Sequence, residues 1–371
     1  MNSILRHSKL SLVLAGLLTA AGLMSGCGTT KETAKTGVDA ASTSANQVQA
    51  AQPAGTSSKE LTLYVAESFD KALSKSFEEK TKIKVNIVHV ATGDLIAKIQ
   101  AERNNPHWDV TWFDGATSMQ SLNKQGLLLK DWSPANIANY TSLGKELIPA
   151  DRSFYPTHVT GAAAIAYNTN LVPKDQAPKD WNDLLEPQFK DSIAMNDPSV
   201  SGPTYPFVAG ILQQFGEVKG KQYFQELKAN GLKTFPKNPN TLQSLLTGAT
   251  KAIMIQDTAI LNAKAKGDPV EIVYPSSGVP MLYGNIAVSP KASNMDAAKQ
   301  FVEYVLSPEA QKQMVDPKVG EADSYYLPII QGVEMSPLRP TEEVKWLNVD
   351  VIKGSDGENE IKKWFHDSIV Q

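Results

Sequence analysis

The sequence predicts an α/β protein of two lobes that are joined by two extended crossings. Short segments of strand character are separated by stretches with apolar residues at helical spacing, which is typical of a mainly parallel sheet with helical connections. A second series of such segments begins after 161–167, and a long strand at 281–288 then leads out of that series. Two α/β lobes connected twice are the simplest architecture that uses all of these segments.

In the first lobe, alternation of apolar and polar residues predicts strands, and apolar residues three or four apart predict helices. Strands are expected at 61–66, 83–88 and 109–113. Helices are expected at 69–80, at 94–103 and after the third strand, where Gly126 would end the helix. Parallel strands connected in this way require right-handed crossovers.

The second lobe repeats the pattern. Strands are expected near Ile193, at 252–255 and at 270–274. Helices are expected at 203–215, 219–229, 240–246 and 257–266, the last closed by Gly267. After the long strand at 281–288, a strongly amphipathic helix is expected at 296–306.

The first 59 residues have a different character. A basic start with Arg6 and Lys9 precedes an apolar stretch at 10–24 that is too short to span a bilayer but suits a signal peptide. The segment 23–27 resembles a bacterial lipobox that ends at Cys27, which we expect to carry a lipid. The alternative is a signal anchor with an incidental cysteine. Lipidation would hold the protein at the cell membrane, on the extracytoplasmic face.

Residues 28–59 contain no aromatic side chain and too few bulky apolar residues to fold. We expect a flexible tether with a reach of about 30 Å. The predicted parts are therefore a signal peptide at 1–26, the lipidated cysteine and tether at 27–59, the first part of lobe 1 at 60–164, lobe 2 at 165–280, the return to lobe 1 at 281–335 and a C-terminal helical segment at 336–371.

Composition excludes several classes of function. The net charge of −3 would become −5 after removal of Arg6 and Lys9, so no nucleic-acid partner is expected. One cysteine allows no disulfide framework and no thiol metal site. No nucleophile elbow, zinc-protease motif or dinucleotide-binding turn occurs, so we expect no enzyme, no cofactor and no metal. The histidines beyond the predicted signal peptide are scattered and are expected in packing or surface roles: His89, His107, His158 and His366.

Small polar clusters stand between a predicted strand and the helix that follows it. Free amides at a helix start favour an anion or an oxygen-rich ligand, and ligands of open α/β sheets bind beyond the carboxyl ends of strands. The predicted ligand-binding residues are Glu67, Ser68, Thr92, Gly93, Asp114, Gly115, Ser199, Ser201, Thr204, Gln256 and Asp257. The alternative for each cluster is simple capping of the helix. Five clusters from both halves of the chain favour a shared ligand.

Several segments in this order resemble the solute-binding proteins of ABC importers, in the ferric-ion-binding-like branch of the type 2 periplasmic binding proteins. They are 61–67, 92–99, 109–112, 126–128, 166–171, 181–185, 197–202, 307–311 and 326–328. The resemblance implies the two-lobed type 2 periplasmic-binding-protein fold, with two mixed sheets flanked by helices and two hinge crossings. It also implies a monomeric receptor that captures a small solute between its lobes and delivers it to a membrane permease.

The solute class is inferred from what the chain lacks. Ferric members of the branch hold the metal with adjacent tyrosines after the strand that corresponds to 252–255, where this chain has Gln256 and Asp257. Tyr325 and Tyr326 lie in a segment expected to pack near the hinge. The serine and threonine hydroxyls and the helix amides suit a phosphate or phosphonate head group, which leaves Glu67 and Asp257 for sugar hydroxyls or an amine.

The favoured solute is therefore a phosphorylated sugar or a phosphonate anion. A ferric ion, a polyamine or thiamine remains an alternative solute. A signalling sensor subunit and an exported hydrolase remain alternative functions. Trp112, Phe113 and Tyr283 are placed either in the pocket or in the core.

Overall fold

Two β-sheets organise the part of the chain that the computed structural model describes, residues 60–340 and 344–371. The predicted signal peptide, Cys27 and the predicted tether lie outside these residues and stay predictions. In the described ranges, no helix is both long enough and apolar enough to cross a membrane.

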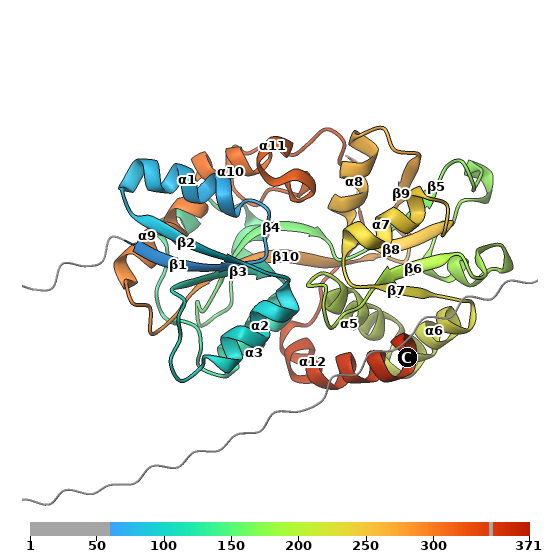
Figure 1. The fold of residues 1–371 in the computed structure, drawn as a ribbon, viewed down its shortest axis with the longest axis horizontal. Helices are drawn as coiled ribbons and strands as arrows, with labels where there is room; N and C mark the ends of the chain where they lie inside the picture. Colours follow the sequence, from blue (N-terminus) through green and yellow to red (C-terminus); the bar gives the residue numbers. More distant parts are fainter. Residues whose placement is uncertain (1–59, 341–343) are drawn as a thin grey trace, which may run out of the picture. The chain divides into compact units, whose positions relative to one another are not determined.

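The first sheet, in lobe 1, has six strands in the order β11-β10-β3-β1-β2, with β4 paired to β10 (Figure 1). β1 runs parallel to β2 and β3, whereas β10 runs antiparallel to β3 and β4, so the sheet is mixed. The strands are β1 (Glu60–Val65), β2 (Lys84–His89), β3 (Val110–Asp114), β4 (Tyr155–Gly161), β10 (Val279–Val288) and β11 (Trp346–Leu347).

Helices cover both faces of this sheet. α1, α10 and α11 lie on one side and α2 and α3 on the other (Figure 1). The helices of lobe 1 are α1 (Asp70–Thr81), α2 (Thr92–Ala101), α3 (Ala116–Lys124), α4 (Ser142–Glu146), α9 (Met295–Val305), α10 (Pro308–Met314) and α11 (Pro317–Gly320), with the 3-10 turns η1 (Ala135–Asn139) and η5 (Glu321–Tyr325). Trp112 and Phe113, adjacent on β3, point to opposite faces and are fully buried in the two apolar layers. Both are therefore core residues.

The second sheet, in lobe 2, has five strands in the order β7-β6-β8-β5-β9. They are β5 (Ala164–Asn168), β6 (Ile193–Asn196), β7 (Lys233–Phe235), β8 (Ala252–Ile255) and β9 (Val270–Val273). α7 (Asn238–Leu246) and α8 (Asp257–Ala265) cover one face, and α5 (Thr204–Phe215) and α6 (Glu217–Ala229) cover the other (Figure 1). Three short 3-10 helices complete the lobe: η2 (Lys174–Gln176), η3 (Trp181–Leu185) and η4 (Pro187–Phe189).

The chain passes between the lobes at two neighbouring places. β4 of the first sheet leads into β5 of the second after two residues, and β10 returns the chain to the first sheet after β9. Because β4 and β10 pair with each other, the two passages lie side by side. This arrangement confirms the predicted fold of two mixed α/β sheets.

A C-terminal helix, α12 (Val351–Phe365), lies along both lobes below the passages and continues as the π-helical turn η6 (His366–Val370) (Figure 1). Towards lobe 2 it packs through apolar side chains, with Phe365 and Ile369 in that lobe's core. Towards α3 of lobe 1 its contacts are mainly polar, although Val351 in its first turn packs against apolar side chains of that lobe. Glu358 accepts hydrogen bonds from Ser118 at 2.5 Å and from Ser121 at 3.1 Å. The lobes therefore meet here along a polar seam.

Most predicted elements are found with small differences at their ends. α7 begins at Asn238, two residues before the predicted start, because Pro239 favours the first turn of a helix. β10 begins at Val279 rather than at residue 281. The elements that were not predicted are β4, β5, β7, α4 (Ser142–Glu146), α10, α11, β11 and the 3-10 helices.

Candidate functional site

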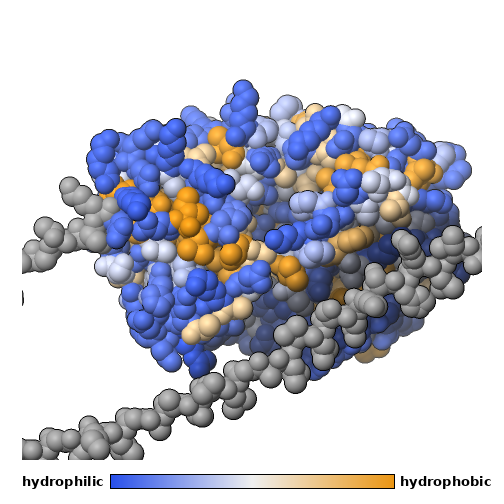
Figure 2. Space-filling model, viewed as in Figure 1, coloured by the Kyte–Doolittle hydropathy of each residue, from blue (hydrophilic) through white to orange (hydrophobic). Residues whose placement is uncertain are grey.

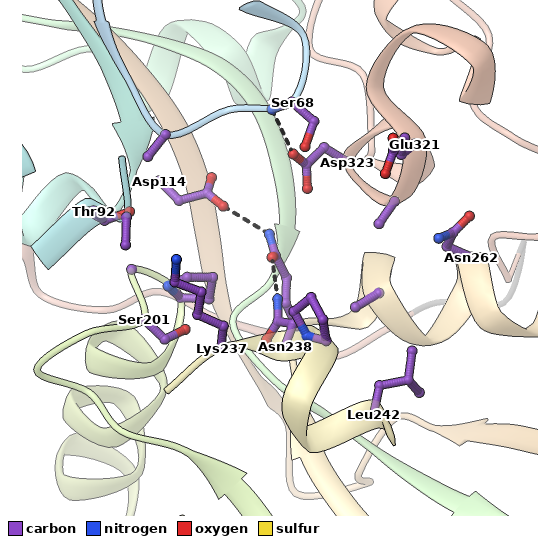
Figure 3. A pocket seen from close by; sticks show the side chains of 18 of the residues that line it. Ser68, Thr92, Asp114, Ser201, Lys237, Asn238, Leu242, Asn262, Glu321 and Asp323 are labelled. Carbon is purple, nitrogen blue, oxygen red and sulfur yellow. Dashed lines mark hydrogen bonds between the residues drawn. The ribbon is translucent and has the colours of Figure 1, made fainter. Parts of the chain in front are cut away.

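A cleft of about 530 Å³ lies where strands of both sheets end and their helices begin (Figure 3). On the lobe 1 side, the cleft is lined by residues at or just after the ends of β1, β2 and β3. On the lobe 2 side, it is lined by residues that follow β6 and β8 and by the first turn of α7. The polar and charged side chains that line it are Ser68, His89, Thr92, Asp114, Ser201, Lys237, Asn238, Gln256, Asn262, Lys266, Glu321 and Asp323.

The lobe 1 wall of the cleft is acidic. Asp114 is the last residue of β3, and Asp323 lies in η5, where its carboxylate accepts a hydrogen bond from the Ser68 amide at 3.0 Å. Figure 3 shows both carboxylates directed towards the middle of the cleft. Burial raises the pKa of Asp323, and the neighbouring Asp114 raises it further. The wall therefore carries negative charge that its own surroundings do not fully compensate.

A third carboxylate lies behind this wall. Glu67 is 1 % exposed, and its Oε1 has no hydrogen-bond partner. Burial, followed by repulsion from Asp114, holds the pKa of Glu67 well above its usual value. The Oδ1 of Asp114 is likewise buried without a partner.

His158 of β4 lies beside these two acids. Its Nε2 is 3.5 Å from Asp114 Oδ1 and 4.0 Å from Glu67 Oε2. The imidazole also packs against the rings of Phe69 and Tyr326, in agreement with the expected packing role. Donor atoms of Glu67, Asp114 and His158 all lie within 4.8 Å of one another, so this is the group in the described chain that could hold a metal ion.

The opposite wall is formed by helix starts and carries the positive charge. Lys237 precedes α7, and Figure 3 shows its amine directed into the cleft between Thr92 and Ser201. α2, α5, α7 and α8 all begin at the cleft, and in none of them does the N-cap side chain bond the first turn. Simple capping therefore does not account for the polar clusters at α2, α5 and α7, and the amides and dipoles of these helix starts favour an anion. At α8 the Asp257 carboxylate accepts a hydrogen bond from the Thr258 amide.

Gln256 joins the two walls. Its Nε2 donates to Asp114 Oδ2 at 2.9 Å and to Thr160 Oγ1 at 3.3 Å, while its Oε1 accepts from Asn238 Nδ2 at 3.3 Å (Figure 3). Because Gln256 follows β8 of lobe 2 and Asp114 ends β3 of lobe 1, this chain of bonds crosses the cleft. The lobes are therefore in a closed arrangement.

Two glycines permit the close contact of the lobes beside the cleft. A Cβ at Gly93 of α2 would lie 2.4 Å from the carbonyl oxygen of Ser199 in lobe 2. A Cβ at Gly202 would lie 2.5 Å from the hydroxyl of Thr92. Any side chain at either position would hold the lobes apart.

Five of the predicted ligand-binding residues line the cleft together: Ser68, Thr92, Asp114, Ser201 and Gln256. The other six do not form its surface. Glu67 lies behind the acidic wall, and Gly93 and Ser199 form the contact between the lobes. Gly115 takes a φ of 112° before α3, and Thr204 is buried at the start of α5.

Asp257 has a different environment from the one we predicted. It is fully buried, and its Oδ2 accepts hydrogen bonds from Arg339 Nη2 at 2.7 Å and Nη1 at 3.0 Å. Burial raises the pKa of Asp257, and the guanidinium opposes that shift. This ion pair ties the segment before residue 341 to the start of α8, so the contacts of Asp257 are structural.

Sequence reasoning missed Lys237, Asn238, Asn262, Lys266, Glu321, Asp323 and His89 at the cleft. Lys237 and Asn238 could have been found, since Pro239 marks a helix start in the same way as Pro203. Asp323 carries no such signal because it comes from a turn far along the chain. The tyrosine pair is buried, and the Tyr326 hydroxyl donates to the Gln311 carbonyl at 3.1 Å instead of facing the cleft.

Comparison with known proteins agrees with this architecture. Residues 72–343 match the family model of bacterial extracellular solute-binding proteins. An uncharacterised Haemophilus influenzae protein is 28 % identical over 301 residues, which cover 78 % of this chain and 85 % of that protein. A Salmonella paratyphi A periplasmic protein to which 2-aminoethylphosphonate binding has been ascribed is 23 % identical over 249 residues, or 64 % of this chain and 69 % of that protein.

Among solved structures, the periplasmic binding protein AfuA of Actinobacillus pleuropneumoniae, with fructose-6-phosphate bound, is similar with a TM-score of 0.75 and 25 % identity. The match covers 84 % of this chain and 98 % of AfuA. The family match spans well over half of the sequence, and the fold, the two lobes and the cleft between them all agree with it. The chain therefore belongs to the family of bacterial extracellular solute-binding proteins.

Proposed function

We propose that this receptor binds a small organic solute with a phosphate or phosphonate head group and delivers it to an ABC permease. The observation that carries the proposal is the set of uncapped helix starts around Lys237. The start of α2 brings the Thr92 hydroxyl, the segment before α5 brings Ser201, and α7 brings Lys237 itself. A lysine amine, two hydroxyls and oriented amides are the groups that proteins use for such oxyanions.

Binding would favour closure because the head group contacts both lobes at once. Thr92 belongs to lobe 1, and Ser201 and Lys237 belong to lobe 2. A ligand that interacts better with the closed form shifts the equilibrium towards it by its differential affinity. The sugar phosphate bound by AfuA and the phosphonate ascribed to the Salmonella protein are of the same chemical class, which supports the proposal.

We also propose that the receptor is a monomer anchored to the membrane by a lipid. Removal of residues 1–26 and lipidation of Cys27 would anchor a monomeric receptor to the outer face of the cell membrane through the tether. A tether with a reach of about 30 Å keeps the solute-loaded domain near its permease at a high effective concentration. Fractionation of cells that produce Cys27→Ala tests this: the variant should leave the membrane fraction, and retention there would contradict lipid anchoring.

The head-group proposal is tested by thermal unfolding of the purified protein with fructose-6-phosphate, 2-aminoethylphosphonate, inorganic phosphate, Fe(III)-citrate and spermidine. A ligand at a hundredfold excess over its Kd stabilises the native state by about 2.7 kcal/mol, which raises Tm. We expect a phosphorylated or phosphonate compound to do so. Stabilisation by Fe(III) or spermidine alone would refute the proposed solute class.

Lys237→Met gives the matching residue test. It should weaken binding of the stabilising phosphorylated compound at least about tenfold, because it removes the cationic contact of the head group. Lys219→Met, which changes an exposed lysine of α6 outside the cleft, is the control and should leave affinity unchanged. Equal effects of the two variants would show that only the overall charge matters.

A further inference from the structure

The two walls of the cleft carry opposite charge. Asp114, Asp323 and Glu321 line the lobe 1 side, and Lys237 and Lys266 come from lobe 2. Neither lysine forms an ion pair with another residue of the described chain. A solute with an anionic head alone would occupy the lysine side and would leave the carboxylates facing it.

The acidic wall holds more negative charge than its neighbours neutralise. Asp114 receives one amide donor from Gln256, and Asp323 receives the amide of Ser68. Glu67 Oε1 and Asp114 Oδ1, both buried, have no hydrogen-bond partner. Buried carboxylate oxygens without donors are costly, so a wall built in this way favours a positive group next to it.

His158 compensates this charge only in part. Its Nδ1 lies 2.9 Å from the Thr157 hydroxyl, and its Nε2 approaches the acids no closer than 3.5 Å. The Thr157 hydroxyl already accepts from the indole of Trp112 at 3.2 Å, so its own hydrogen is free to point to Nδ1. In that arrangement one imidazole N–H faces two carboxylates.

We propose that the solute carries a protonated nitrogen as well as its anionic head, and that the nitrogen binds at Asp114 and Asp323 with Glu67 behind them. This inference rests on the proposed head-group site and narrows it from phosphorylated compounds in general to amino-phosphonates or amino-phosphates. The head group lies between Thr92, Ser201 and Lys237, and the amine lies across the cleft (Figure 3). The chemistry of the cleft thus selects a solute with two opposite charges.

The decisive measurement is calorimetric titration of the purified protein with 2-aminoethylphosphonate and with propylphosphonate, in which a methyl group replaces the ammonium. We expect the amino compound to bind at least about tenfold more tightly, as one charged contact in a partly buried site requires. Asp323→Asn retains an acceptor for the Ser68 amide and should bring the two affinities to within about threefold. Glu334→Gln, an exposed acid outside the cleft, should leave the tenfold ratio intact.

The other outcomes separate the two proposals. Equal affinities for both phosphonates, or tighter binding of fructose-6-phosphate, would overturn the amine site while leaving the head-group site standing. Binding of ethanolamine without any phosphonate would overturn the head-group site and leave the amine site. Binding of none of these compounds would overturn both.

Discussion

The α-helices at the cleft and the capped α-helices of the described chain begin differently. Away from the cleft, α4, α9, α10, α11 and α12 each begin with a side chain that accepts a hydrogen bond from the first turn. At the cleft, α2, α5, α7 and α8 begin without one, as α1, α3 and α6 also do. A capping side chain stabilises its own helix and occupies amides that a ligand would need. All five capped starts therefore belong to helices outside the proposed solute site, although an uncapped start alone does not mark that site.

α8 is the exception among the cleft starts and gives the largest expected effect. Asp257→Ala would leave the buried guanidinium of Arg339 without its partner, which should cost about 3–5 kcal/mol of unfolding free energy. The double variant with Arg339→Met should recover much of that loss. Denaturant unfolding measures both. A normal stability combined with lost solute binding would return Asp257 to the role predicted from sequence.

Gly93→Ala tests the start of α2. The new methyl group would meet the Ser199 carbonyl, so we expect solute affinity to fall at least about tenfold because the lobes cannot close fully. Stability should not fall, since alanine favours a helix by up to about 1 kcal/mol over glycine. Titration and thermal unfolding give the two quantities. Gly357→Ala in α12 is the control and should leave affinity unchanged.

A pair of hydroxyl deletions compares the two kinds of helix start directly. Ser307→Ala removes the bond to the Ala310 amide at the start of α10 and should cost about 1 kcal/mol of stability without changing affinity. Thr92→Val keeps the shape of the side chain at the start of α2 and should weaken solute binding several-fold, at little cost in stability. The same response from both variants would abolish the distinction.

Glu67→Gln gives the smallest expected change in unfolding free energy, and this change depends on pH. The folded protein binds the Glu67 proton more tightly than the unfolded chain, so stability contributed by this group is present below pH 4.5 and is lost as the pH rises to the raised folded pKa. Glutamine cannot ionise, so the unfolding free energy of the variant should change less with pH over this range. The variant should also be more stable than the wild type at neutral pH. Unfolding free energy at several pH values checks the sign; a less stable variant at pH 7 would contradict it.

The order of strands and helices could be predicted because each leaves a local pattern. Alternation marked β1 and β2, and helical spacing marked α1 and α9. β4 was missed because all seven of its residues are buried, so nothing alternates, and Pro156 argues against a strand. The two-lobed fold was nevertheless recognisable from the order of the remaining elements.

The cleft could be predicted only where a residue stands next to its own strand end. Thr92, Asp114 and Gln256 satisfy that condition and line the cleft. Asp323 does not, because it reaches Ser68 from 255 positions further along the chain, and no local pattern records such a pairing. Asp257 satisfies the condition but binds Arg339, since the sequence contains no sign that the C-terminal segment folds back to it.

The polar seam under α12 has a mechanical consequence. Where α3 meets α12, the joining groups are carboxylate, hydroxyl and amine, with Lys124 2.5 Å from Asp356 in addition to the contacts of Glu358. Water can replace each of these partners. Figure 2 shows mostly hydrophilic side chains over the lower part of lobe 1 in this view, with orange apolar patches nearer the middle of the molecule. A hinge motion that parts the lobes along the seam would thus expose mainly polar groups to water, with Val351 as the apolar exception. Opening and closing along this seam would therefore expose little apolar surface through which the protein could associate with other molecules.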